Sequence, residues 1–213
     1  MSFKIFLVFL LILPVALLAQ VNKVKHNSKA FALNTKAFKL LMTSSARDNI
    51  LNRQIIKILD SATIIEPTYN SAYSNKLRPL LSLKKYNSAI SVVNRMILNN
   101  PEDLNSYIKL GVIYESYLKK RNLAIPYYKK SYDLALKNVA QHRRKNSYYD
   151  EVVAYMLMFY KGKVVAIEYL NKISSYYSDT KSKKQIEALQ KLIESFMDDS
   201  ESKKNVFNSI STL

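Results

Sequence analysis

The fold is decided by the stretch "YIKLGVIY" (107–114) and by "LKKRNLAIPYY" (118–128), which follows it. An earlier stretch repeats the second of these, because "LKKYNSAISVV" (83–93) matches 118–128 at a spacing of 35 residues. Tyr107 has its own counterpart 34 positions earlier, at Tyr73, so the later copy gains one residue between the two matches. A fixed period of this length predicts a stack of helix pairs, in which each pair buries its apolar face against its neighbours.

The later copy resembles the tetratricopeptide repeat (TPR), whose pattern is aromatic-x2-Leu-Gly-x2-Tyr, then Ala-x3-aromatic and a closing Pro. The matching residues are Tyr107, Leu110, Gly111, Tyr114, Ala124 and Tyr128, with Tyr73, Ala89 and Pro101 as weaker matches in the earlier copy. The resemblance implies that these residues pack the helices together. It also implies that Gly111 faces Ala124, where two helices cross at close range, and that the fold binds other molecules without catalysis.

We therefore expect an all-α fold, a TPR-like right-handed solenoid of about four helix pairs formed by residues 35–178, with a capping helix at 179–197. The chain is 48% hydrophobic but has two glycines and five prolines, too few for a β-rich chain with many tight turns. The expected helices are 35–47, 51–65, 70–83, 87–98, 104–118, 123–143, 149–160, 164–177 and 180–197.

Two of these helices carry further signals. Asn122 is a candidate N-cap for the helix at 123–143, and Pro126 then falls in its first turn, where a missing N–H costs little. The last helix presents one apolar stripe, which is typical of a helix that covers the open end of a solenoid. The stripe consists of Ile186, Leu189, Leu192, Ile193 and Phe196.

A short basic start and an apolar run mark the N-terminus. Lys4 precedes fifteen apolar residues, Ile5–Ala19, and a polar, basic stretch follows. This layout is that of a secretory signal peptide, so we expect residues 1–19 to be cleaved after Ala19 and the protein to be periplasmic or secreted. An uncleaved membrane anchor is the alternative, although a spanning helix needs about 20 apolar residues. We expect a flexible linker at 20–34 and a frayed tail at 198–213.

Residues suited to catalysis or metal binding are sparse. The chain has no Cys and two His, of which His26 lies in the expected linker and His142 near an expected helix end. The sequence has no His or Cys spacing typical of a metal site, and no Gly-rich phosphate loop. We therefore expect neither enzymatic activity nor a cofactor or metal site.

The formal net charge is +17, and removal of residues 1–19 leaves +16 because Lys4 is lost. This charge favours an acidic protein or peptide, or an anionic polymer, as partner, while a lysine-rich proteome is the alternative explanation. The basic clusters at 119–121, 143–145 and 181–184 lie at different helix ends. That scatter disfavours one continuous groove for nucleic acid, so we expect no nucleic-acid partner.

A partner should bind the concave face, which the first helix of each pair lines. The residues expected there are Asn75, Arg78, Asn105 and Lys109. The resemblance places Asn75 and Lys109 where some TPR proteins hold a peptide carboxylate, but other members of that constellation are missing. The expected function is a protein- or peptide-binding adaptor or scaffold. A structural component of a cell-envelope assembly and a basic surface protein that binds anionic polymers are the alternatives, and a membrane is a partner only if the N-terminal segment is retained.

Overall fold

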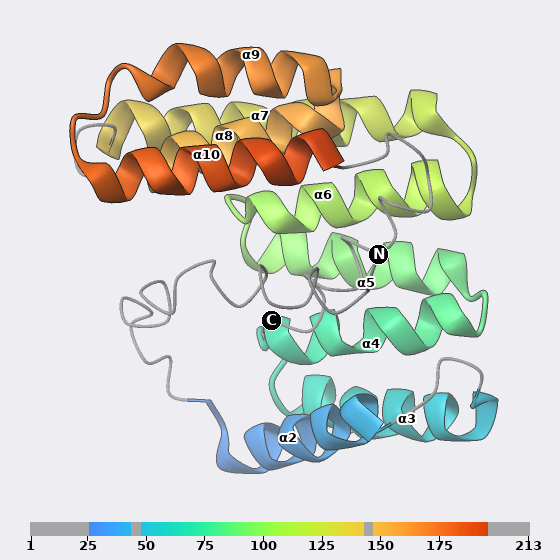
Figure 1. Ribbon diagram of the computed structural model, residues 1–213. Helices are drawn as coiled ribbons and strands as arrows, with labels where there is room; N and C mark the ends of the chain where they lie inside the picture. Colours follow the sequence, from blue (N-terminus) through green and yellow to red (C-terminus); the bar gives the residue numbers. More distant parts are fainter. Residues whose placement is uncertain (1–25, 44–47, 143–146, 196–213) are drawn as a thin grey trace.

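The computed structural model describes residues 26–43, 48–142 and 147–195. The regular structure in these ranges is helical, without strands. The elements are α2 (Ser28–Thr43), α3 (Asn49–Ile65), α4 (Asn70–Ser82), α5 (Tyr86–Asn99), α6 (Leu104–Val112), the π-helix η2 (Ile113–Tyr117), α7 (Arg121–His142), α8 (Tyr148–Lys161), α9 (Lys163–Ser174) and α10 (Thr180–Ser195). Figure 1 shows them stacked into one column, from α2 and α3 at one end to α9 and α10 at the other.

Consecutive helices form the pairs α2–α3, α4–α5, α6–α7 and α8–α9, and each pair packs against the next. In the described ranges these four pairs are followed by α10, which packs against α9 and α8 (Figure 1). The predicted all-α helical repeat is thereby confirmed. The first helix of each pair, together with α10, forms one layer, and the second helices form the other.

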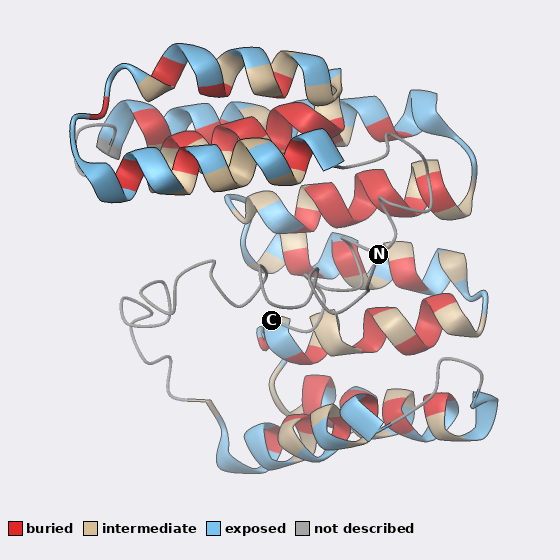
Figure 2. Ribbon diagram, viewed as in Figure 1, coloured by how far each residue is buried: buried red, intermediate tan, exposed pale blue. Residues whose placement is uncertain are grey.

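Small residues allow the helices to approach one another. Ala89, Ala124, Ala154 and Ala166 are fully buried between neighbouring helices. Figure 2 shows that burial is greatest on the helices in the middle of the column, whereas α2 at one end has a largely exposed outer side. The core is therefore continuous along the stack, because each pair is covered on both sides by its neighbours.

Gly111 makes the closest approach in the stack. A Cβ atom on Gly111 would lie 2.1 Å from Cε1 and 2.5 Å from Cδ1 of Tyr128. The three atoms nearest to that Cβ all belong to the Tyr128 ring. The tyrosine side chain reaches back from α7 over the glycine and is fully buried.

The other expected packing residues take varied positions. Leu110 is fully buried, whereas Tyr107 and Tyr114 are half-buried. The Tyr114 ring stacks on Tyr127 with 5.5 Å between the ring centroids. Pro101 is exposed in the turn before α6, and its carbonyl accepts a hydrogen bond from the Tyr107 hydroxyl at 2.9 Å. Pro101 therefore ends one repeat without belonging to the core.

The residue gained by the later copy lies in η2. The two copies end in equivalent turns, in which Lys84 and Lys119 adopt left-handed conformations with φ of 56° and 59°. In the first turn Lys85 N donates to Leu80 O at 2.8 Å, five residues back, whereas Lys120 N donates to Tyr114 O, six residues back. The i→i+5 hydrogen bonds of a π-helix enclose one residue more than the i→i+4 bonds of an α-helix, so a single π turn accommodates one inserted residue. The sequence revealed the insertion but not its place.

The expected linker at 20–34 is wrong for residues 28–34, which form the first turns of α2. Asn27 starts this helix because its side-chain oxygen accepts hydrogen bonds from Lys29 N at 3.0 Å and Ala30 N at 3.3 Å. His26 is also held in place, since it stacks on Tyr69 at 4.0 Å. The polar composition of this segment concealed a buried stripe formed by Ala30, Asn34, Ala37 and Leu41.

The remaining differences concern helix ends. Asn122 is not an N-cap, because α7 already begins at Arg121, where the turn after η2 ends. Pro126 accordingly lies beyond the first turn. The helix expected at 164–177 ends at Ser174. Tyr177 lies beyond this end and is buried. Four further predictions concern residues outside the described ranges: the signal peptide at 1–19, the basic cluster at 143–145, Phe196 of the apolar stripe and the frayed tail at 198–213.

Candidate functional site

The four predicted partner-binding residues lie on the first helices of two neighbouring pairs. Asn75 and Arg78 belong to α4, and Asn105 and Lys109 belong to α6. We call the surface formed by these four residues and Ser74 the polar face. The structure connects it to α2 on one side, because α2 packs against α4.

Lys109 is at the centre of the polar face and is 5% exposed. Its Nζ donates a hydrogen bond to Ser74 Oγ at 3.0 Å, and it forms no ion pair with an acidic residue of the described chain. Burial lowers the pKa of Lys109, and the negative charge of Asp103 offsets part of this effect. A buried ammonium with one neutral hydrogen-bond partner is costly.

The burial of Lys109 corrects the expectation that the repeat packing leaves this side chain free. The cause is the position of α6 in the middle of the stack, where α5 and α7 pack against it. Five consecutive residues, from Ile108 to Val112, are buried as a result. Helical spacing alone had placed Lys109 on the exposed side of α6.

Asn75 holds α4 to α2. Its Nδ2 donates to Asn34 Oδ1 at 2.9 Å, and Asn34 Nδ2 in turn donates to the Tyr69 hydroxyl at 3.1 Å. Asn34 and Tyr69 are buried and Asn75 is half-buried. The amide of Asn75 therefore stabilises the contact between two first helices, which leaves less of it for a ligand than the sequence suggested.

Arg78 stabilises the end of α2. Its guanidinium donates to the backbone carbonyl of Leu41 at 3.0 Å. The last carbonyls of a helix have no partner within the helix, and a cation near this end interacts favourably with the helix dipole. Arg78 is half-buried by this contact.

Asn105 is the exposed member of the four predicted residues. It lies one turn before Lys109, so the two side chains share one side of α6. The N-cap Asp103 fixes this turn, because it accepts a hydrogen bond from Asn105 N at 3.1 Å and another from Ser106 Oγ at 2.5 Å. The start of α6 is thus fixed by its N-cap, and the Asn105 side chain is exposed there.

The sequence interpretation missed Asn34, Tyr69 and Asp103. Asp103 was detectable, since an Asp directly before an apolar helical pattern is a typical N-cap. Asn34 was also detectable, because it continues the spacing of Ala30, Ala37 and Leu41. For Tyr69 no local signal exists, since its role depends on residues 35 positions away.

Two acidic groups, the half-buried Glu115 and the buried Asp150, stabilise the fold. Glu115 of η2 accepts a hydrogen bond from the Tyr128 hydroxyl at 2.8 Å and pairs with Arg121, which joins η2 to α7. Asp150 accepts hydrogen bonds from the hydroxyls of Tyr177, at 2.6 Å, and Tyr169. The described ranges contain no group of three or more His, Cys, Asp or Glu residues that could hold a metal ion. No helix in the same ranges is both long and apolar enough to cross a membrane.

Comparisons with known proteins leave the family open. No family model and no curated protein matches the chain. One similar solved structure is titled "MamA RS-1 ArsTM double mutant", with a TM-score of 0.45 and 13% sequence identity. The match covers 87% of this chain and 94% of that one. The likeness to TPR proteins thus rests on the residue pattern at 107–128 and on the stack of helix pairs.

Proposed function

We propose that this protein is a non-enzymatic helical-repeat scaffold that binds a protein or peptide on the polar face of α4 and α6. The observation that carries the proposal is Lys109, whose buried ammonium has one described hydrogen-bond partner, the hydroxyl of Ser74. Such a group reduces the stability of the folded chain, and groups of this kind are concentrated at functional sites. A binding role accounts for a lysine at a position where an apolar residue would serve the fold better.

The partner that fits this site carries a carboxylate. A carboxylate oxygen near Nζ would form a charge-assisted hydrogen bond, which is roughly twice as strong as one between neutral groups. The Asn105 amide, one turn away, can donate to the same segment or accept from its backbone. An acidic side chain or a free C-terminus supplies this chemistry, and the surplus of positive charge would speed its approach.

We further propose that the protein acts outside the cytoplasm. The support is the basic start, the apolar run Ile5–Ala19 and the polar stretch that follows it, which together have the layout of a signal peptide. The partner is then a protein of the periplasm, the cell surface or the surroundings of the cell.

The proposal is tested by affinity capture from the protein's own cells, followed by mass spectrometry and a binding titration with the protein that is captured. The variant Lys109→Met combined with Asn105→Ala should lose at least about 2 kcal/mol of binding free energy, which corresponds to roughly 30-fold in Kd. The matched control is Lys57→Met with Gln54→Ala, since both residues are exposed on α3 and the change likewise removes one positive charge and one amide.

The control variant should bind as the wild type does at physiological salt. Equal weakening by both variants would mean that the net charge alone attracts the partner, which favours a basic protein that binds anionic polymers. Unchanged binding of the Lys109→Met and Asn105→Ala variant would show that the polar face is not the site.

A further inference from the structure

The outer face of α2, at one end of the column, is largely exposed (Figure 2). This helix buries Ala30, Asn34, Ala37 and Leu41 against α3 and α4. Beside this buried stripe α2 carries Phe31 and Met42, which are 53% and 63% exposed. At the other end of the column, α10 covers the last helix pair. The two ends of the solenoid therefore differ, and the α2 end presents large apolar side chains to its surroundings.

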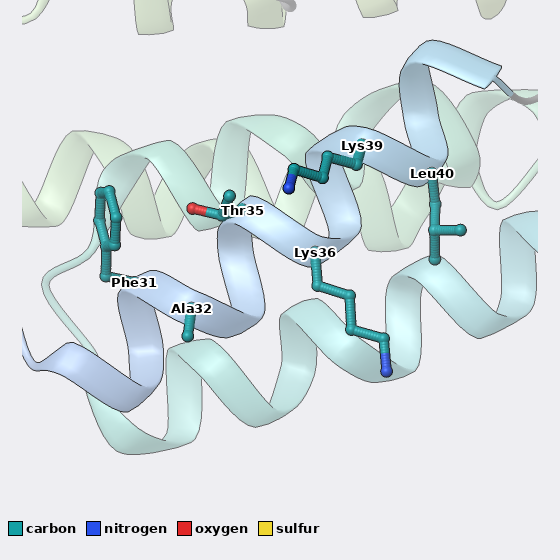
Figure 3. A pocket seen from close by; sticks show the side chains of 6 residues that line it. All are labelled: Phe31, Ala32, Thr35, Lys36, Lys39 and Leu40. Carbon is teal, nitrogen blue, oxygen red and sulfur yellow. The ribbon is translucent and has the colours of Figure 1, made fainter.

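The α2 outer face combines these apolar groups with positive charge. It contains a shallow hollow of about 570 Å³ that is lined by Phe31, Ala32, Thr35, Lys36, Lys39 and Leu40 (Figure 3). Lys29 adds a third exposed lysine, and the helix contains no acidic residue. Whatever covers this face must therefore accept apolar side chains and carry negative charge.

We propose that the α2 outer face lies on an anionic membrane surface. A helix with aromatic and aliphatic residues beside lysines binds at the lipid headgroup region, where the apolar side chains insert and the lysines meet anionic headgroups. All six residues that line the hollow come from one helix, so it has no second wall to grip a peptide. A single helix face of this kind is suited to a planar surface.

A second copy of the chain fits this face less well. Pairing of two α2 outer faces by a twofold axis would place lysines of one copy against lysines of the other. The α10 end of another copy is also basic, with Lys181, Lys183 and Lys184 exposed. Charge therefore disfavours both ways of stacking copies through α2.

The position of α2 in the sequence supports the same orientation. Residues 20–27 separate the apolar run ending at Ala19 from the start of α2 at Ser28. Eight residues span at most about 28 Å when extended. An apolar run that stays in the membrane would hold α2 close to the membrane surface, whereas cleavage after Ala19 would remove this tether.

The test uses single-cysteine variants of the full chain, which has no native cysteine. A fluorophore on the Met42→Cys variant reports on the α2 outer face, and one on Leu98→Cys reports on an equally exposed apolar site of α5. Each protein is mixed with vesicles of phosphatidylcholine alone or with a third of phosphatidylglycerol, both containing nitroxide lipids that quench at headgroup depth. Every variant keeps residues 1–25, so attachment by that segment is the same in all samples.

We expect quenching at position 42 in the anionic vesicles, at least about fivefold stronger than in neutral vesicles, and little quenching at position 98. Adding Lys36→Glu and Lys39→Glu should reduce the quenched fraction by about tenfold or more. The matched control, Lys183→Glu with Lys184→Glu on α10, makes the same change of charge at the other end and should leave quenching intact. An unchanged circular dichroism melt confirms that each variant is folded.

Equal quenching in both kinds of vesicle, or at positions 42 and 98, would overturn the proposal. Equal loss with the α10 control would do so as well, because binding would then follow the net charge and not α2. Absence of quenching at position 42 in anionic vesicles would show that this face does not meet the membrane. None of these results bears on the polar face of α4 and α6, so this inference and the proposed function fail separately.

Discussion

Gly111 shows how closely one position can be determined by a single neighbour. The Tyr128 ring occupies the space that a side chain at position 111 would need, and Tyr128 is itself fixed by its hydrogen bond to Glu115 and by contact with Phe159. In the TPR-like pattern of this chain, the glycine and the second aromatic residue, Gly111 and Tyr128, therefore contact each other directly.

We expect Gly111→Ala to destabilise the fold by about 1–3 kcal/mol, because a methyl group at 2.1 Å from Tyr128 Cε1 forces the ring to move. Chemical denaturation measures the change. In a double-mutant cycle, most of this cost should vanish in the Tyr128→Ala background, where the ring is absent. Additive effects of the two substitutions would place the clash elsewhere.

Lys109 should reduce stability while it serves binding. Since burial lowers its pKa in the folded chain, the charged form is disfavoured on folding. This penalty is complete below the folded pKa and disappears as the pH rises through that pKa toward the ordinary lysine value of 10.5.

We therefore expect Lys109→Met to raise the melting midpoint at pH 7, by ~2–4 °C for each 1 kcal/mol gained. The difference in melting midpoint between the variant and the wild type should decrease as the pH approaches 10.5. Thermal unfolding at several pH values measures this. A lower midpoint for the variant at pH 7 would mean that the Ser74 hydrogen bond outweighs the cost of burial.

Two buried serines provide a matched pair. The Ser116 hydroxyl in η2 has no hydrogen-bond partner among the described residues, whereas Ser131 Oγ donates to Leu104 O at 2.9 Å. We expect Ser116→Ala to be neutral or stabilising by up to ~1 kcal/mol, and Ser131→Ala to be destabilising by ~1 kcal/mol. Thermal unfolding of both variants tests the contrast, and equal destabilisation would show that Ser116 has a partner after all.

At the scale of single elements, the two best repeats differ by the π-helix η2, which the later repeat contains. Within η2, Glu115 accepts a hydrogen bond from the Tyr128 hydroxyl and pairs with Arg121. The turns that follow α4 and η2 share a left-handed lysine, a conformation that usually belongs to glycine at the end of a helix.

Replacement of Lys84 by glycine should stabilise the α4–α5 turn by ~0.5–1 kcal/mol, because its φ of 56° strains a residue that has a Cβ. The comparison is Lys130→Gly, on an exposed position inside α7, which should cost roughly 1 kcal/mol. Urea denaturation of the two variants gives both values. A loss of stability in the Lys84→Gly variant would contradict the strain at this turn.

At the scale of the whole molecule, the column has one end closed by α10 and another formed by α2. A solenoid needs covered ends because each unit leaves an apolar face for the next. At one end this face is covered by α10, whose Ile186 and Ile193 are buried and which packs against α8 and α9. The α2 end instead presents apolar residues beside lysines, which is consistent with a surface that meets a partner.

The whole chain also carries the prediction about export. The exported protein should begin at Gln20, because the apolar run and the Ala19–Gln20 junction fit cleavage by a signal peptidase. Intact-mass spectrometry of the protein from its own cells reads this directly. A mass that includes residues 1–19 would indicate that the N-terminal segment stays in the membrane.

The sequence by itself determined the helix pairs, their order and most of their limits. Those properties depend on local spacing, since small and aromatic residues at helical intervals predict which sides of neighbouring helices meet. Leu110, Gly111, Ala124 and Tyr128 were recognisable as packing residues for this reason. The inserted residue was recognisable as well, because it shifts the period from 34 to 35.

The tertiary structure alone decided which polar residues remain available. Asn75 reaches Asn34 over 41 positions, Arg78 reaches Leu41 over 37, and Lys109 reaches Ser74 over 35. Each contact crosses from one helix pair to the next, and no spacing within a helix predicts which side chain reaches across. Helical periodicity gives the direction of a side chain from its own helix, whereas its burial depends on the neighbour that packs over it.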